Sequence, residues 1–218
     1  MNNVVSIALL AVFVSFTSYL FDFTWLELGA NLSDFSWIIN LTSGSGSLMV
    51  ITCLALILTG LYTQNKKHYF KTLARFLCFI LMLIVCVLSL KSSVEVKRPF
   101  QVLLSEPSMS CTKVQAVKCV KPINIANWQK SHWENESRFS LPSGHAAFTF
   151  FITTFFSLLL YKNGYKILTL GLFSWTVLVS YSRLLIGVHW PLDILIGAVM
   201  GIVFGYLSFI PSSFKLRP

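Results

Sequence analysis

Charge is scarce in this sequence. Only 11% of its 218 residues are charged and only eight are Asp or Glu, whereas 55% are hydrophobic. An average soluble domain has charge on about a quarter of its residues. A soluble protein built from these segments would lack the polar surface needed to cover its apolar helices, and the composition therefore argues against that class.

Several other signals are absent as well. No internal repeat, low-complexity tract or Gly/Ser linker divides the chain, so we expect one membrane-embedded domain over residues 1–218. The N-terminus has no basic stretch and no clear small-residue cleavage site before Asp22, so 4–21 is expected to be a retained helix and not a cleaved secretory signal. No set of His, Cys and carboxylates has metal-ligand spacing, and we therefore expect neither a metal nor another cofactor.

Long apolar runs are the main feature that is present. Runs of roughly 17 to 20 residues with almost no charge can cross a bilayer as helices. The fold class expected is therefore all-α, an integral membrane protein with about six transmembrane helices and a helical outward-facing loop region over 91–145. The expected spans lie at about 4–21, 46–63, 73–90, 146–161, 166–182 and 193–210.

The distribution of charge predicts the orientation. Six crossings put both termini on the same side of the membrane. The segments expected on that side contain no acid and are basic. Their cations are Lys66, Lys67, Lys71, Arg75, Lys162, Lys166, Lys215 and Arg217. Cytoplasmic segments carry such an excess, so both termini are predicted to be cytoplasmic. This cytoplasmic excess of Lys and Arg accounts for most of the net charge of +9, so the charge gives little reason to expect a nucleic-acid-binding protein. The partner that we expect is the lipid bilayer.

The cysteines divide into two groups. Cys53, Cys78 and Cys86 fall within apolar runs, where a thiol behaves as a small hydrophobe. Cys111 and Cys119 lie in "CTKVQAVKC" in the expected outward loop. An oxidising compartment would allow a disulfide between these two, and two free thiols are the alternative that stays open.

Three polar segments interrupt the apolar pattern. "KSSVEVKRP" follows the third run, "PSGH" precedes the fourth, and "SRLLIGVHWPLD" links the fifth to the sixth. Counting the crossings puts all three on the outward face. Segments far apart in the sequence are thus expected to meet at one membrane boundary, as an assembled site requires.

The residues of these segments suit a phosphoryl group. Lys91, Arg98 and Arg183 can converge on an anion, and the planar fork of a guanidinium matches phosphate. At the start of the fourth helix, the amides of Ser143 and Gly144 and the Ser143 hydroxyl can donate to the same ligand. A lone Lys at a helix end would be an interfacial anchor, so the prediction depends on the motifs occurring together.

Two histidines complete the expected chemistry. One of His145 and His189 can attack phosphorus while the other protonates the leaving group. Asp193 follows His189 by four residues, so its carboxylate can accept a hydrogen bond from the ring and fix the tautomer. This spacing favours His189 as the nucleophile but does not by itself decide between the two.

Together these residues resemble the signature of the type-2 phosphatidic acid phosphatase superfamily. The three parts of that signature are Lys91 with Arg98-Pro99, Pro142-Ser143-Gly144-His145, and Ser182-Arg183 with His189 and Asp193. The stretches "KRPFQVLLSE", "SHWENESRFSLPSGH" and "SRLLIGVHWPLD" resemble the phosphatidylglycerophosphatase B family of bacteria. The resemblance is detailed over the second half of the chain and is only an apolar helical pattern over the first.

The resemblance implies a metal-independent enzyme that hydrolyses lipid phosphates at the outer face of the bacterial inner membrane. In that superfamily the histidine at the position of His189 is the nucleophile and forms a phosphohistidine. The histidine at His145 is the general acid, and Asp193 supports the nucleophile. The residues implied to hold the phosphoryl oxygens are Lys91, Arg98, Ser143, Gly144 and Arg183.

The sequence leaves the substrate and some competing functions open. Phosphatidylglycerophosphate, undecaprenyl diphosphate, phosphatidic acid and a lipid A phosphate all fit a site at the bilayer edge, and the resemblance favours the first two. A phosphotransferase would pass the phosphoryl group to a second lipid such as lipid A. A non-catalytic lipid-phosphate transporter would have no need for His189 paired with Asp193. Vanadium haloperoxidases share the constellation but are soluble.

Overall fold

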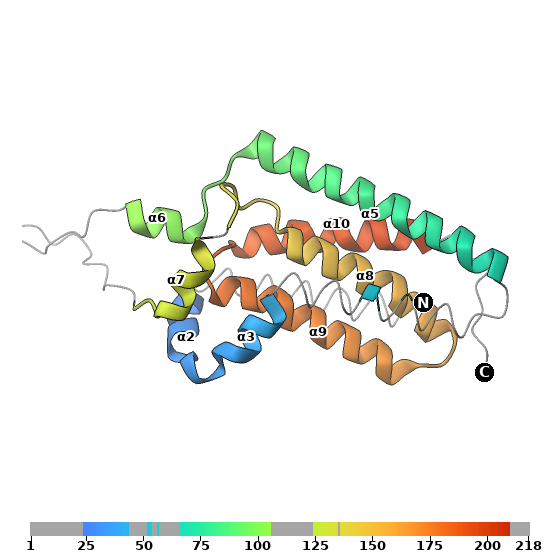
Figure 1. Ribbon diagram of the computed structural model, residues 1–218, viewed down its shortest axis with the longest axis horizontal. Helices are drawn as coiled ribbons and strands as arrows, with labels where there is room; N and C mark the ends of the chain where they lie inside the picture. Colours follow the sequence, from blue (N-terminus) through green and yellow to red (C-terminus); the bar gives the residue numbers. More distant parts are fainter. Residues whose placement is uncertain are drawn as a thin grey trace, which may run out of the picture.

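The computed structural model is built from helices (Figure 1). The structure describes residues 24–43, 52, 53, 56, 66–105, 124–134 and 136–209. No strand occurs within these ranges. The helices are α2 (Thr24–Asn31), η2 (Ser33–Phe35, a 3₁₀ turn), α3 (Ser36–Ser43), α5 (Lys66–Val94), α6 (Pro99–Ser105), α7 (Asn127–Trp133), α8 (Gly144–Lys162), α9 (Lys166–Leu185) and α10 (Pro191–Phe209).

Four of the helices are long and apolar enough to cross a membrane. They are Tyr69–Val94, Gly144–Tyr161, Lys166–Leu185 and Pro191–Phe209. They confirm the last four of the predicted spans, while those predicted at 4–21 and 46–63 lie outside the described residues, apart from isolated positions in the second. The third span is longer than predicted, because α5 continues to Val94 and includes Lys91 in its last turn.

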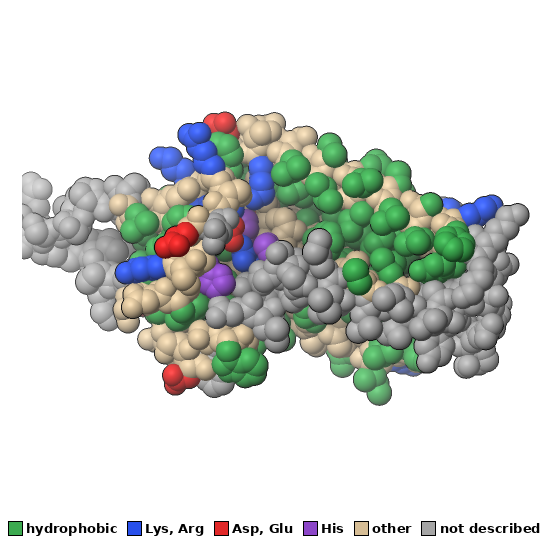
Figure 2. Space-filling view, viewed as in Figure 1, with side chains coloured by type: hydrophobic (Ala, Val, Ile, Leu, Met, Phe, Trp, Pro, Cys, Tyr) green, Lys and Arg blue, Asp and Glu red, His purple; other side chains and the backbone are tan. Residues whose placement is uncertain are grey.

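The four long helices run side by side along the molecule (Figure 1). α8 packs against both α9 and α10, and α5 packs against α10 and α8. The outer side of α5 is apolar and exposed, with Leu81 and Val85 each 62% accessible, which is what a helix facing lipid requires. Figure 2 shows hydrophobic side chains over the long helices, and most of the charged and histidine side chains of this face near the end that carries α6 and α7.

Glycine lets α10 approach α8 backbone to backbone. Gly197, Gly201 and Gly205 recur every fourth residue and so share one side of α10. A Cβ atom at Gly197 would lie 2.5 Å from the carbonyl oxygen of Ser143, and one at Gly205 would lie 2.7 Å from that of Phe151. Side chains are therefore excluded from this seam, as is common where membrane helices pack closely. The seam places the beginning of α10 against the beginning of α8.

A tight turn joins α9 to α10. α9 is followed by Gly187, whose φ of +84° is the left-handed conformation that often ends a helix, and its amide donates to the carbonyl of Leu184 at 2.8 Å. Pro191 opens α10, where its fixed φ suits the first helical position and its missing N–H costs nothing. The turn therefore holds His189 between two fixed helix ends.

The short helix α7 is tied to that turn through its buried side chains. Trp133 donates from Nε1 to the carbonyl of Ile186 at 2.7 Å and stacks on Phe100 with ring centroids 4.9 Å apart. Gln129 is fully buried and donates to the carbonyl of Leu185 at 2.6 Å. The prediction of a helical loop region is confirmed for its described part, and this region braces the turn that carries His189.

Candidate active site

The helix ends that carry the predicted site residues meet at one end of the bundle. Lys91 lies in the last turn of α5, His145 in the first turn of α8, Arg183 in the last turn of α9 and Asp193 in the first turn of α10. Arg98 immediately precedes α6. The prediction that these separate segments share one end is confirmed, because each long helix reverses the direction of the one before it (Figure 1).

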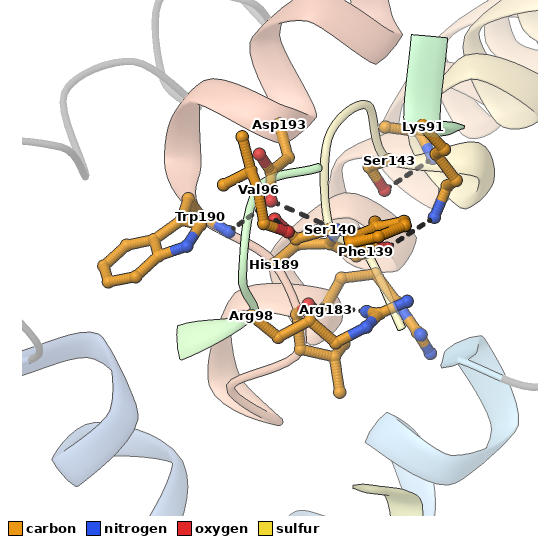
Figure 3. A network of polar contacts seen from close by, with 12 residues as sticks. Lys91, Val96, Arg98, Phe139, Ser140, Ser143, Arg183, His189, Trp190 and Asp193 are labelled. Carbon is orange, nitrogen blue, oxygen red and sulfur yellow. Dashed lines mark hydrogen bonds and ion pairs between the residues drawn. The ribbon is translucent and has the colours of Figure 1, made fainter. Parts of the chain in front are cut away.

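His189 and Asp193 form a buried pair. Nδ1 of His189 lies 3.3 Å from Oδ2 of Asp193, and each side chain is 2% exposed. The same carboxylate oxygen accepts the amide of Trp190 at 2.8 Å, an arrangement like the acidic half of a helix capping box. Figure 3 shows His189 between Asp193 and the side chains of Arg98 and Arg183. The carboxylate is thus fixed on one side of the ring, and the cations lie on the other.

The surroundings of His189 keep its ring neutral. Burial lowers its pKa well below the ordinary value of 6.5, and the positive charges of Arg98, Arg183 and Lys91 lower the pKa further. A charge on His145 would lower the pKa of His189 in the same direction. A neutral imidazole is the form that can act as a nucleophile.

Arg98 is anchored by several protein acceptors. Its side chain is 1% exposed. Nε donates to the carbonyl of Ser137 at 2.6 Å, Nη2 donates to the Ser137 hydroxyl at 2.7 Å, and Nη1 donates to the carbonyl of Val188 at 2.6 Å. Val188 precedes His189, so this guanidinium is held directly beside the candidate nucleophile.

Glu136 joins the two buried guanidinium groups. Its Oε2 lies 3.0 Å from Nη2 of Arg98, and its Oε1 accepts a hydrogen bond from Nη2 of Arg183. Burial raises the pKa of the Glu136 carboxyl, but the charges of Arg183 and Arg98 outweigh burial and the net shift is downward. Glu136 is therefore ionised at neutral pH.

Glu136 is a site residue that the sequence pattern did not reveal. Glu134 lies only two residues earlier, and the two acids look alike in "HWENES". Glu134 is exposed, whereas the Glu136 side chain is 18% exposed and reaches the arginines. Only the excess of cations in the predicted site signals that an acid is needed nearby, and this signal does not say which one.

Lys91 turns from the end of α5 toward the loop before α8. Its Nζ donates to the carbonyl of Phe139 at 3.1 Å and to the Ser137 hydroxyl at 3.3 Å. The backbones of Phe139 and Lys97 form an isolated antiparallel β-bridge, and the Ser140 hydroxyl donates to the carbonyl of Val96 at 3.2 Å. These contacts bring the segment around Arg98 beside the loop (Figure 3). Lys91 therefore belongs to this cluster and is more than an interfacial anchor.

The beginning of α8 differs in one detail from what the sequence suggested. The Ser143 hydroxyl accepts the amide of Ala146 at 3.4 Å and so caps the helix. The Ser143 amide donates to the backbone carbonyl of Asp193 at 2.9 Å. Because this N–H already has a partner within the protein, it does not donate to a ligand. The Ser143 hydroxyl hydrogen and the Gly144 amide remain the candidate donors, because the first amides of a helix have no partner within it.

Two expectations concern metals and cysteines. Among the described residues, no group of three or more His, Cys, Asp or Glu side chains could hold a metal ion. Metal independence stays a prediction. Cys111 and Cys119 lie outside the described residues, so the proposed disulfide also stays a prediction.

Several known proteins are similar in sequence to part or most of this chain. Phosphatidylglycerophosphatase B of Haemophilus influenzae is 26% identical over 202 residues, which cover 79% of this chain and 81% of the relative. Phosphatidylglycerophosphatase B of Escherichia coli is 34% identical over 77 residues, or 35% of this chain and 30% of the relative. Undecaprenyl-diphosphatase of Sulfolobus acidocaldarius is 36% identical over 89 residues, or 41% of each chain.

A solved structure and a protein family also match. The crystal structure of a transmembrane PAP2 type phosphatidylglycerolphosphate phosphatase from Bacillus subtilis superposes with a TM-score of 0.55 and 20% identity, covering 95% of this chain and 94% of that one. This likeness concerns the fold. The PAP2 superfamily matches residues 72–215, which include every motif of the candidate site. The chain therefore belongs to the PAP2 superfamily.

Proposed function

We propose that this membrane enzyme, a lipid phosphatase of the PAP2 superfamily, hydrolyses a phosphomonoester or diphosphate of a membrane lipid through a phosphohistidine on His189. The observation that carries the proposal is the environment of that residue. His189 is buried and neutral, contacts the carboxylate of Asp193, and has Arg98 and Arg183 beside it. Such a ring can attack phosphorus, and the nearby charges can stabilise the transition state.

The reaction divides into two steps. First, the free ring nitrogen of His189 bonds to phosphorus, the bond from phosphorus to the leaving oxygen breaks, and His145 gives that oxygen a proton. Second, water attacks the phosphohistidine while His145 takes one of its protons, and inorganic phosphate is released as the bond between nitrogen and phosphorus breaks. Asp193 stabilises the positive charge that develops on the His189 ring.

The cations of the site oppose the charge of the phosphoryl oxygens. Arg98 and Arg183 are almost fully buried, so their charges act with little screening by water. Lys91 supplies a third charge from the end of α5. The hydroxyl of Ser143 and the amide of Gly144 add hydrogen-bond donors at the start of α8, where the helix dipole also favours an anion.

A lipid suits this site because the site lies at the end of four apolar helices. The chain of the lipid can stay among these helices and the bilayer while only the phosphate reaches the cations. The named activities of the relatives point to phosphatidylglycerophosphate, undecaprenyl diphosphate or both as substrate. We place the protein in the bacterial inner membrane, with the site facing outward and both termini in the cytoplasm, from the distribution of Lys and Arg.

Product analysis tests this proposal. Purified protein in detergent is given phosphatidylglycerophosphate, undecaprenyl diphosphate, phosphatidic acid and a lipid A phosphate in turn, and both free phosphate and lipid products are measured. Free phosphate from one of the first two is the expected result. A phosphoryl group that appears on a second lipid without free phosphate would instead identify a phosphotransferase. Binding without any change in the lipid would identify a transporter.

A further inference from the structure

Glu136 lies outside the motifs of the proposed site, yet it contacts the two guanidinium groups that are proposed to hold phosphate. One carboxylate oxygen pairs with Nη2 of Arg98 at 3.0 Å and the other with Nη2 of Arg183. A phosphoryl group would present its oxygens to the same two side chains. The carboxylate therefore holds a position that the phosphoryl group needs.

Arg98 has too few N–H donors to bind the Glu136 carboxylate and a phosphoryl group fully at the same time. A guanidinium carries five N–H groups. Among the described residues, Ser137 accepts two of them and Val188 accepts one, and Nη2 also forms an ion pair with Glu136 at 3.0 Å. Two of the five N–H groups then remain, one on each terminal nitrogen, and Nη2 is the nitrogen that is paired with Glu136. Arg98 can therefore offer both remaining groups to a phosphoryl group only if Glu136 leaves Nη2.

The charges of the cluster also favour an exchange. Lys91, Arg98 and Arg183 supply three positive charges, and Glu136 and Asp193 supply two negative ones. Both carboxylates repel a phosphate dianion that enters the cluster, and this repulsion is costly away from water. The departure of one carboxylate reduces the repulsion.

Of the two carboxylates, Glu136 is the one that can leave. Its side chain is 18% exposed, so water lies within reach, whereas that of Asp193 is 2% exposed. Asp193 is also held by the amide of Trp190 and by His189. The low pKa of Glu136 means that the competitor for the arginines is a full negative charge.

We propose that Glu136 is a displaceable stand-in for the substrate's phosphoryl group. In the resting enzyme it pairs with Arg98 and Arg183, and an incoming phosphoryl group takes its place while the carboxylate turns to water. This inference rests on the proposed function, which assigns the two arginines to phosphate. Because Glu136 competes for the site, it weakens the binding of phosphate and helps the product to leave.

Binding of inorganic phosphate tests the inference without any turnover. The full-length protein in detergent is titrated with phosphate in a calorimeter as wild type, as Glu136→Gln and as Glu134→Gln. Glutamine keeps the shape of glutamate without its charge, and Glu134 is an exposed acid of the same loop. We expect Glu136→Gln to bind phosphate at least about tenfold more tightly than wild type, because its arginines are open for a larger fraction of the time. Glu134→Gln should bind like wild type.

Two results of this titration would overturn the inference. One is equal or weaker binding of phosphate by Glu136→Gln, and the other is no binding by any of the three proteins. Hydrolysis is a separate question. A protein that binds phosphate as expected but releases none from any lipid would refute the proposed hydrolysis, whereas the displacement of Glu136 by phosphate would still hold.

A second measurement uses the unaltered protein, so it does not depend on how a variant folds. In a crystal structure with vanadate, an analogue of phosphate, we expect vanadate oxygens on Arg98 and Arg183 and the Glu136 carboxylate turned away from both. Vanadate bound beside His189 with Glu136 still on the two arginines would contradict the inference.

Discussion

Nδ1 of His189 lies 3.3 Å from Oδ2 of Asp193, one helical turn further along the chain, and both side chains are shielded from water. The carboxylate also accepts the amide of Trp190, so the start of α10 sets its direction. The backbone carbonyl of Asp193 accepts the amide of Ser143 from α8. The pair is therefore fixed in place by the same contacts that join the two helices.

Replacing the carboxylate of this pair should slow the chemistry and leave binding intact. We expect Asp193→Asn to lower kcat by about a hundredfold or more, because the amide cannot stabilise the charge on the ring. KM should change little, since Asp193 does not contact the phosphoryl group in the proposed complex. Asn keeps an acceptor for Trp190, so the unfolding temperature should stay close to that of wild type. Steady-state kinetics that gave an unchanged kcat would show that Asp193 does not support the nucleophile.

The activity should persist as the pH falls through the ordinary range of histidine. Burial, together with Arg98 and Arg183, holds the pKa of His189 well below 6.5, so the ring stays neutral and nucleophilic at and below that pH. Protonation of the ring removes activity only at lower pH. In a plot of kcat/KM of the free enzyme against pH, the acidic limb should therefore lie below pH 6.5.

The substrate also titrates in this range, because a phosphomonoester has its second pKa at about 6. The profile is therefore measured with two lipids whose phosphates differ in pKa, and a limb that is common to both belongs to the enzyme. A common limb at or above pH 6.5 would mean that His189 is not held neutral by its surroundings.

The seam between α8 and α10 should not tolerate a single methyl group. A Cβ atom at Gly201 would collide with the backbone carbonyl of Ala147, so we expect Gly201→Ala to destabilise the protein by about 1 to 3 kcal/mol. At Gly171 of α9 an added Cβ atom would meet nothing within 4 Å among the described residues beyond its own stretch of helix, and Gly171→Ala is the matched control. Alanine favours helix there by up to about 1 kcal/mol. Thermal unfolding in detergent that ranked the two variants equally would contradict this packing.

Removal of metal ions should leave the activity unchanged. The proposed reaction uses cationic side chains where other phosphatases use metal ions, and the described residues contain no group of metal-ligating side chains. Phosphate release is measured before and after dialysis against a strong chelator, and again after divalent ions are restored. A loss of activity that magnesium or zinc reverses would contradict the mechanism.

Much of the site could be predicted because its motifs lie at the ends of apolar runs. The number of runs between two motifs decides whether they share an end of the bundle, and this correctly brought Lys91, Arg183 and His189 together. The four-residue spacing from His189 to Asp193 also survives in the structure, since the beginning of α10 places the carboxylate back over the preceding turn.

Other features depend on contacts that spacing does not encode. Glu136 reaches Arg98 and Arg183 whereas Glu134 is exposed, and the sequence around the two acids does not show which of them turns inward after α7. The commitment of the Ser143 amide to Asp193 follows from the close approach of α8 and α10. Contacts of this kind between distant segments need three-dimensional packing to be seen.

Phosphate release by His189→Ala is the most direct test of the central claim. Wild type, His189→Ala and the control His68→Ala, at the opposite end of α5 from Lys91, are assayed in detergent with phosphatidylglycerophosphate and undecaprenyl diphosphate. The account predicts that loss of the nucleophile lowers the rate at least about a thousandfold, while His68→Ala keeps the wild-type rate. Release of phosphate by His189→Ala at a rate near that of wild type would contradict the account, because the reaction would then not pass through this histidine.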